Sequence, residues 1–178
     1  HNIVSGTQAI ASCLYGVLRP GDTLVSVAGA PYDTLEEVIG IRGGEDAGSL
    51  KDFGVNYTQV DLLEDGTVDF ERIQKLFRAK KIKAALIQRS RGYAWRDSLT
   101  LETIGRIIAE IKAADPEVIC IVDNCYGEFV EEKEPTEMGA DIVVGSLIKN
   151  IGGSIALSGG YAAGKAAYIE KISYRLTA

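Results

Sequence analysis

The sequence predicts an α/β fold of three layers, in which a mostly parallel sheet has helices on both faces. Two observations lead to this prediction. Short apolar runs rich in β-branched residues alternate with longer stretches whose apolar residues recur at helical spacing. The apolar runs are almost continuous, as expected for strands covered on both faces. Such alternation is typical of strand–helix–strand units, and therefore of parallel pairing.

The elements follow one another in a regular order. The runs predicted as strands are residues 23–27, 84–87, 118–122 and 141–144. The stretches predicted as helices are residues 7–18, 69–80, 100–114 and 165–176. The third of these helices shows one apolar stripe most plainly, formed by Leu101, Ile104, Ile107, Ile108 and Ile111. Glycines gather at the junctions between segments, as in Gly43-Gly44 and Gly152-Gly153.

Length and composition predict one well-packed core, since the chain has 178 residues of which 46% are apolar. The formal charge of -6 argues against a nucleic-acid partner, which would favour a clustered basic face. One basic cluster, Arg78, Lys80, Lys81 and Lys83, falls at the end of a predicted helix. There cations favour the negative end of the helix dipole, so we interpret the cluster as a solvated surface.

The three cysteines, Cys13, Cys120 and Cys125, fit neither paired disulfides nor a Cys-x-x-Cys metal site. We interpret them as small core residues in a reducing compartment, and predict no metal. No apolar stretch approaches the roughly 20 residues that a membrane-spanning helix needs. We therefore expect a cytoplasmic protein with no membrane partner. The first residue is His1 rather than a start methionine, and we expect a piece of a longer polypeptide.

Three motifs carry candidate chemistry. Ser5-Gly6-Thr7 precedes a predicted helix, where free backbone N–H groups suit a phosphate, although Ser and Thr also cap ordinary helices. Asp123 follows a buried strand, whose carboxyl end faces the ligand crevice of such sheets, although an Asp also opens ordinary turns. Lys149 follows another buried strand; desolvation there would lower its pKa and leave some neutral, nucleophilic amine. The alternative is an exposed loop lysine.

Residues 89–98 form a long connection rich in Arg, Tyr and Trp. Functional residues collect on such loops, so we predict that this stretch is one wall of a site.

In order, these motifs resemble those of the fold type I pyridoxal-phosphate enzymes. Ser-Gly-Thr stands before a helix, Tyr32 lies 25 residues after Thr7, Asp-Asn-x-Tyr ends a strand, and Ser-x-x-Lys follows. Within these enzymes the chain is most similar to the methionine gamma-lyase-like group, which includes the aluminium resistance proteins. The resemblance runs from residue 2 to about residue 164. It implies that residues 1–178 form the cofactor-binding large domain, with a small C-terminal domain and an N-terminal segment missing.

The resemblance also implies roles for particular residues toward pyridoxal 5'-phosphate. Lys149 would hold the internal aldimine and move the proton of the substrate Cα. Asp123 would pair with the pyridine nitrogen, so that the ring accepts electrons. Tyr126 would lie near the 3-oxygen of the ring. Tyr32 would stack on the ring and take part in catalysis.

At the other end of the cofactor, Gly6 and Thr7 would offer backbone N–H groups to the phosphate, and Ser146 would add a hydroxyl. The sequence departs from the related sulfur-amino-acid lyases at Ile148, where those enzymes often carry a second hydroxyl. The Asn that contacts the ring oxygen in those lyases also has no clear match. Arg91 or Arg96 could replace it, and pairing of these arginines with surface carboxylates is an equally open interpretation.

These resemblances predict a lyase that cleaves a carbon–sulfur bond of an amino acid, as a homodimer or homotetramer. An aminotransferase remains open, because both chemistries begin with the same covalent adduct. A Ser146-x-x-Lys149 acylating pair is a weaker hypothesis, since the further Ser-Asp-Asn and Lys-Thr-Gly motifs of penicillin-recognising enzymes do not occur. A hypothesis without catalysis is a phosphate-binding α/β scaffold. A dinucleotide-binding domain of this kind would need a Gly-x-Gly-x-x-Gly fingerprint, which the sequence lacks.

Overall fold

The fold is built on one six-stranded sheet with the strand order β2-β1-β3-β4-β5-β6. The computed structural model describes residues 3–153 and 155–176; residues 1–2, 154 and 177–178 of the predicted domain lie outside this description. The first five strands pair in parallel, and β6 pairs with β5 in the antiparallel direction. Their bounds are β1 Thr23–Ser26, β2 Asn56–Gln59, β3 Ala84–Gln88, β4 Ile119–Asp123, β5 Ile142–Ser146 and β6 Gly160–Gly164.

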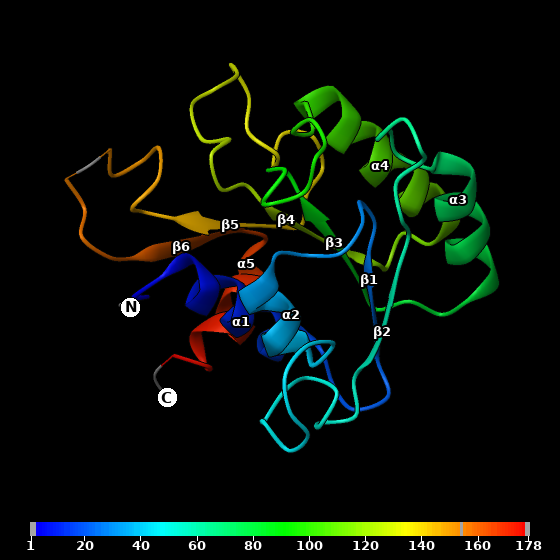
Figure 1. Ribbon diagram of the computed structural model, residues 1–178, viewed down its shortest axis with the longest axis horizontal. Coiled ribbons are helices and arrows are strands. Elements are labelled where there is room, and N and C mark those ends of the chain that lie inside the picture. Colours follow the sequence, from blue (N-terminus) through cyan, green and yellow to red (C-terminus); the bar gives the residue numbers. More distant parts are fainter. Residues whose placement is uncertain (1–2, 154, 177–178) are drawn as a thin grey trace.

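Helices cover both faces of this sheet (Figure 1). Their bounds are α1 Gly6–Val17, α2 Asp33–Ile39, α3 Phe70–Ala79, α4 Leu101–Ala114 and α5 Ala166–Ser173. The helices α3 and α4 pack on one face, and α1, α2 and α5 pack on the other. The predicted three-layer, mostly parallel α/β architecture is therefore confirmed.

Alternating residues of the buried strands pack into two hydrophobic cores, one on each face of the sheet. In β1, Val25 belongs to the cluster on the α3 and α4 face, and Leu24 belongs to the cluster on the α1 face. In β4, Val122 belongs to the cluster on the α3 and α4 face, and Ile121 belongs to the cluster on the α1 face. This two-sided burial explains why the strand sequences are apolar without interruption. The stripe predicted for α4 is buried throughout, from Leu101 to Ile111.

Three elements were not predicted: β2, β6 and α2. The edge strands β2 and β6 are only partly buried, so neither carries a continuous apolar run. The helix α2 has only seven residues, too few to show a clear helical period. Predicted boundaries also shift: β5 continues to Ser146, and α5 ends at Ser173 rather than at residue 176.

Side chains from the sequence motifs cap the helices. The hydroxyl of Ser5 accepts a hydrogen bond from Gln8 N at 3.0 Å, and the carboxylate of Asp69 accepts one from Arg72 N at 2.9 Å. Arg78 lies in the last turn of α3, as predicted for a basic residue at the negative end of the dipole.

The cysteines are free, as predicted. Cys13 and Cys120 are buried in the core, whereas Cys125 is only partly buried. Among residues 3–153 and 155–176, no group of three or more His, Cys, Asp or Glu side chains could hold a metal ion. No helix of that part of the chain is long and apolar enough to cross a membrane.

A buried ion-pair cluster lies at the amino end of β5. Asp141 is fully buried, and its carboxylate oxygens lie 2.7 Å from Lys112 Nζ and 2.6 Å from Lys165 Nζ. It also accepts a hydrogen bond from Cys120 N at 2.8 Å. Burial alone would raise the pKa of Asp141, but the hydrogen bonds from Lys112 and Lys165 outweigh it and lower the pKa below its ordinary value.

We expect Asp141→Asn to destabilise the fold by about 2 kcal/mol, because it leaves two ammonium groups beside a neutral amide; their partial exposure keeps the loss below that of a fully buried pair. A carboxyl whose pKa is lowered by folding stabilises the fold above its unfolded pKa, about 3.9. The difference in urea midpoint between wild type and variant should thus be constant near neutral pH and shrink as pH falls below about 4. A difference that grows in acid would contradict this account.

Candidate functional site

The carboxyl ends of the parallel strands open into a cavity of about 560 Å³. Such ends face the ligand crevice in open α/β sheets. The cavity is lined by residues that follow β1, β3, β4 and β5 and by the first residues of α1. All seven residues predicted for a site line it: Gly6, Thr7, Tyr32, Asp123, Tyr126, Ser146 and Lys149.

The start of α1 forms one end of the cavity. Ser5 caps the helix with its hydroxyl, so the capping interpretation is correct for Ser5. The backbone N–H groups of Gly6 and Thr7 belong to the first helical turn, which has no acceptors within the helix, and both residues line the cavity. An anion at this end would meet N–H groups and the positive end of the helix dipole.

Gly6 lets this helix end lie directly against β5. A Cβ atom built on Gly6 would lie 2.9 Å from the Cβ of Ser146, closer than real Cβ atoms approach. Ser146 is the last residue of β5 and is buried, so it cannot yield easily. The absence of a side chain at residue 6 thus brings the Ser146 hydroxyl and the helix N-terminus to the same end of the cavity.

Tyr32 lies between the first two helices. It precedes α2, its backbone N–H donates to Gln88 Oε1 at 2.9 Å, and its hydroxyl lies 3.4 Å from Thr7 Oγ1. Burial raises the pKa of Tyr32 to about 12. The phenol is therefore neutral near pH 7, and it can donate a hydrogen bond but not serve as an ionised base.

Asp123 ends β4 and its side chain is only 5% exposed. Its Oδ1 accepts a hydrogen bond from Cys125 N at 3.1 Å. Burial raises the pKa of Asp123, and the backbone N–H and thiol of Cys125, which lower it, do not compensate. A buried carboxyl that borders a cavity with so little compensation suits a cationic partner inside the cavity.

Lys149 corrects one prediction. The sequence suggested a desolvated lysine with a lowered pKa, but Lys149 lies in a turn beyond the end of β5 and is only partly buried. Its Nζ donates to the Tyr126 hydroxyl at 2.5 Å and lies 4.5 Å from the centre of the Tyr126 ring. This hydrogen bond raises the pKa of Lys149, and the smaller effect of desolvation does not reverse it. The amine is therefore protonated near neutral pH.

Ser146 rules out the acylating-serine hypothesis. A Ser-x-x-Lys acyl enzyme needs its serine at the start of a helix, whereas Ser146 is buried at the end of a strand.

Sequence reasoning missed Gln88, the buried last residue of β3. Its Oε1 accepts from Tyr32 N and its Nε2 donates to Ser90 O at 3.1 Å, so it joins the segments that follow β1 and β3. The sequence did carry a signal for this residue, because Gln88 is a polar residue directly after the apolar run 84–87. Cys125, interpreted from sequence as a core residue, also lines the cavity.

The loop of residues 89–98 contributes Ser90, Gly92 and Tyr93 to the cavity wall. Arg91 and Arg96 do not line it. Arg96 donates to the backbone oxygens of Gln88 and Ser90, at 3.0 and 2.6 Å, and Arg91 lies over the Trp95 ring. Neither takes the place of the missing Asn.

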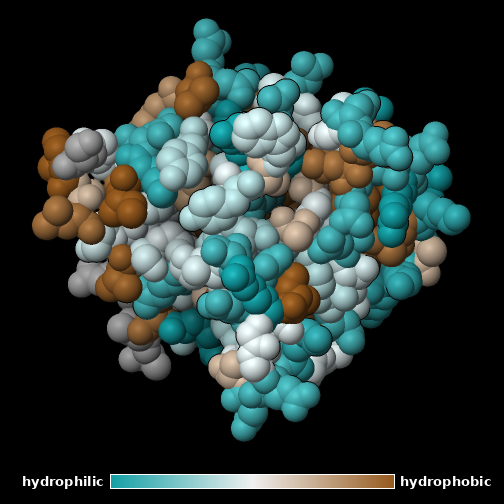
Figure 2. All heavy atoms as spheres, in the orientation of Figure 1, coloured by the Kyte–Doolittle hydropathy of each residue, from teal (hydrophilic) through white to brown (hydrophobic). Residues whose placement is uncertain are grey.

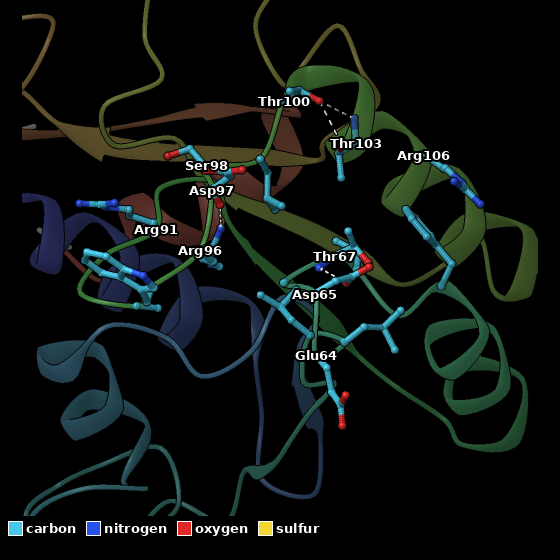
Figure 3. Close-up of a pocket in the computed structure, with 18 residues that line it drawn as sticks. Glu64, Asp65, Thr67, Arg91, Arg96, Asp97, Ser98, Thr100, Thr103 and Arg106 are labelled. Carbon is cyan, nitrogen blue, oxygen red and sulfur yellow. Dashed lines mark hydrogen bonds between the residues drawn. The ribbon is translucent and has the colours of Figure 1, made fainter.

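Both arginines border a second, larger hollow of about 960 Å³ (Figure 3). Figure 3 shows Arg96 beside Asp97 on the loop of residues 89–98, with Asp65 and Thr67 on the facing loop and Arg106 on α4. Its charged side chains are of both signs, and it contains none of the predicted site residues. The smaller cavity is the candidate site, because the strand ends and the start of α1 converge there.

We expect Gly6→Ala to destabilise the fold by about 1–3 kcal/mol, because the new methyl group must displace α1 from β5. A matched control is Gly105→Ala in α4, where the new Cβ would meet the flexible end of Met138. That change is expected to alter stability by no more than about 1 kcal/mol. Urea midpoints of the two variants provide the measurement, and equal losses would refute the close contact at Gly6.

Comparison with known proteins identifies relatives over the whole chain. Residues 1–178 match the family described as Methionine gamma-lyase. An uncharacterized protein, YnbB of Bacillus subtilis (strain 168), is 54% identical over 98% of this chain and 41% of its own length. A structure from Clostridium novyi NT, described as a carbon-sulfur lyase involved in aluminum resistance, has 53% identity and a TM-score of 0.93, covering 98% of this chain and 41% of that chain.

A more distant structure shows the same fold. YhfS of Escherichia coli, described as a pyridoxal-5'-phosphate dependent protein, has 22% identity and a TM-score of 0.72, covering 99% of this chain and 42% of that chain. The chain thus spans less than half of the length of these relatives.

Proposed function

Because this chain belongs to the methionine gamma-lyase family, we propose that it is the cofactor-binding part of a pyridoxal-phosphate-dependent carbon–sulfur lyase that acts on a sulfur amino acid. The resemblance to the aluminium resistance group is confirmed by the relatives. The observation that carries the proposal is that the Lys149 amine, the Asp123 carboxyl and the N-terminus of α1 border one cavity.

The residues present fit pyridoxal phosphate at both of its ends. The N–H groups of Gly6 and Thr7 and the hydroxyl of Ser146 would hold the phosphate. Ile148 supplies no hydroxyl, but Ser158 lines the same cavity, and we assign to it the role of additional phosphate ligand.

At the other end, Asp123 would face the ring nitrogen. A protonated pyridine nitrogen supplies the positive charge that this buried carboxyl lacks among the described residues, and would return its pKa to lower values. When bound, the cofactor supplies an electron sink for the bonds at the substrate Cα. The flat ring of Tyr32 would cover the cofactor, and its neutral phenol would donate rather than accept a proton.

Lys149 would carry the cofactor and handle the proton at the substrate Cα. Its amine is protonated near neutral pH, as in an ordinary lysine, and the hydrogen bond to Tyr126 raises its pKa further. It must therefore lose a proton before it attacks a carbonyl group, and as a free neutral amine it could take up the proton of the substrate Cα and later donate it to a leaving group. Tyr126 thus raises the pH at which the amine becomes reactive.

The mouth of the cavity is rich in exposed apolar side chains. Tyr93 and Leu157 line it and are 89% and 95% exposed, and Ile155 is 88% exposed. Figure 2 shows hydrophobic side chains gathered at the left of the molecule, where Figure 1 has the segment between β5 and β6. Exposed apolar patches mark interaction surfaces, which supports our proposal that the protein forms a homodimer or homotetramer through this face.

The test is to load the full-length protein with pyridoxal phosphate, reduce it with borohydride and map the modified peptide. We expect the cofactor on Lys149 and none on the Lys149→Arg variant, with Lys51, an exposed lysine, as an unlabelled internal control. Incubation with sulfur amino acids should release a thiol together with a keto acid.

Each contrary outcome has a distinct meaning. A protein that binds no cofactor would favour the non-catalytic scaffold hypothesis. Keto acid without thiol would favour an aminotransferase, and label on another lysine would overturn the assignment of Lys149.

A pH profile tests the role of Tyr126. The wild-type protein stripped of cofactor should recombine with pyridoxal phosphate faster as pH rises, because only the neutral Lys149 amine reacts. Tyr126→Phe removes the acceptor of its hydrogen bond, which lowers the pKa of Lys149, so the profile should shift to lower pH. Tyr174→Phe, a change on the surface outside the cavity, is the control. An unchanged profile for Tyr126→Phe would refute the coupling.

A further inference from the structure

The segment of residues 124–131, between β4 and β5, has an unusual backbone. Two of its residues that carry a Cβ, Tyr126 and Phe129, adopt left-handed conformations with φ of 68° and 62°. Such conformations are disfavoured for bulky residues and persist only where surrounding contacts impose them. The segment must therefore be anchored from outside.

Arg89 supplies that anchor. It follows β3 and is only 4% exposed. Its Nη1 donates to Asn124 Oδ1 at 2.8 Å and to Gly127 O at 2.9 Å, and its Nη2 donates to Glu131 Oε1 at 2.5 Å. The three acceptors lie before, between and after the left-handed residues. One guanidinium group thus ties down the whole segment, which suits its planar set of donors.

Glu134 completes the anchor from the other side. Its carboxylate accepts from Asn124 Nδ2 at 2.8 Å and from Phe129 N at 2.9 Å. Gly127 packs against the arginine: a Cβ built there would lie 2.5 Å from Arg89 Cδ and 2.6 Å from its Nε. Glycine at residue 127 therefore leaves the space that the buried side chain of Arg89 occupies.

The anchored segment is linked to the Lys149 turn by two hydrogen bonds. Lys149 Nζ donates to the Tyr126 hydroxyl, and Asn150 Nδ2 donates to Glu128 O at 3.0 Å. Tyr126 is 56% exposed, so its own packing constrains it little. The place of its hydroxyl depends on the backbone that Arg89 holds.

We propose that Arg89 is a positioning residue that places Tyr126 and, through the Tyr126 hydroxyl, orients the amine of Lys149. This inference deepens the proposed function and relies on it for the role of Lys149. Besides Tyr126, the titratable groups near the amine are Cys125 and Tyr93, and the same cavity also holds Asp123, Tyr32 and Asp33. The guanidinium of Arg89 donates to none of these side chains.

The experiment measures the pH midpoint for acetylation of Lys149 by acetic anhydride in full-length protein freed of cofactor, quantified by mass spectrometry. Arg89→Lys keeps the charge but loses the planar donors. We expect it to lower the midpoint by about 0.5–1 pH units, as for loss of one side-chain hydrogen bond, and Tyr126→Phe to lower it equally. The double variant should shift no further than Tyr126→Phe alone, because Arg89 acts through Tyr126.

Gly127→Ala provides a second approach if Arg89→Lys folds poorly. It leaves Arg89 in the sequence but forces its side chain aside, and should give the same shift. Asp141→Asn, which weakens the fold from the amino edge of the sheet, should leave the midpoint unchanged. Unshifted midpoints for the Arg89 and Gly127 variants, or shifts that add to that of Tyr126→Phe, would overturn the proposal. The measurement reports on the Lys149 amine without cofactor. It therefore tests the role of Arg89 even if the wild-type protein binds no cofactor.

Discussion

The alignment of parallel strands at their carboxyl ends is the constraint on which the candidate site depends. The pairing places Gln88 of β3 beside Asp123 of β4, and Asp123 beside Val144 of β5, two residues before Ser146. Each chain segment therefore leaves the sheet at the same edge. Because α1 packs against β5 through Gly6, its N-terminus reaches that edge as well. Residues far apart in the sequence thereby border one cavity.

Buried carboxyl groups at the two edges of the sheet differ in their partners and in the direction of their pKa shifts. At the amino edge, Asp141 has two lysine partners, and these hydrogen bonds lower its pKa. At the carboxyl edge, burial raises the pKa values of both Asp123 and Glu128, and the nearby groups do not compensate. Compensated charge stabilises a fold, whereas incompletely compensated charge beside a cavity is typical of functional sites. This asymmetry supports our proposal that a cationic ring nitrogen meets Asp123.

Reactivity of the lysine, in our account, depends on contacts two steps away. Arg89 holds the backbone segment in which Tyr126 has a left-handed conformation, which is energetically unfavourable for a residue with a Cβ. The hydroxyl of Tyr126 in turn accepts the hydrogen bond of Lys149. The energetic cost of the left-handed residues is offset by the three hydrogen bonds of the buried Arg89 guanidinium group. The chain belongs to the methionine gamma-lyase family, and this arrangement fits the role that we propose for Lys149.

By itself, the sequence determined the α/β class, four of the six strands, and seven of the residues that border the cavity. The class and the strands follow from apolar period, and the candidates Gly6, Thr7, Asp123 and Lys149 follow from their positions at the ends of predicted elements, which are local properties of the chain. The roles of Tyr32, Tyr126 and Ser146 came from the family resemblance. Only the tertiary structure decided the edge strands β2 and β6, the contacts of Gln88 and Arg89, and the hydrogen bond that raises the pKa of Lys149. Each of these depends on partners distant in sequence: Tyr126 accepts from Lys149 across 23 residues, and Arg89 reaches Gly127 across 38. No local pattern encodes such contacts, because folding alone brings the partners together.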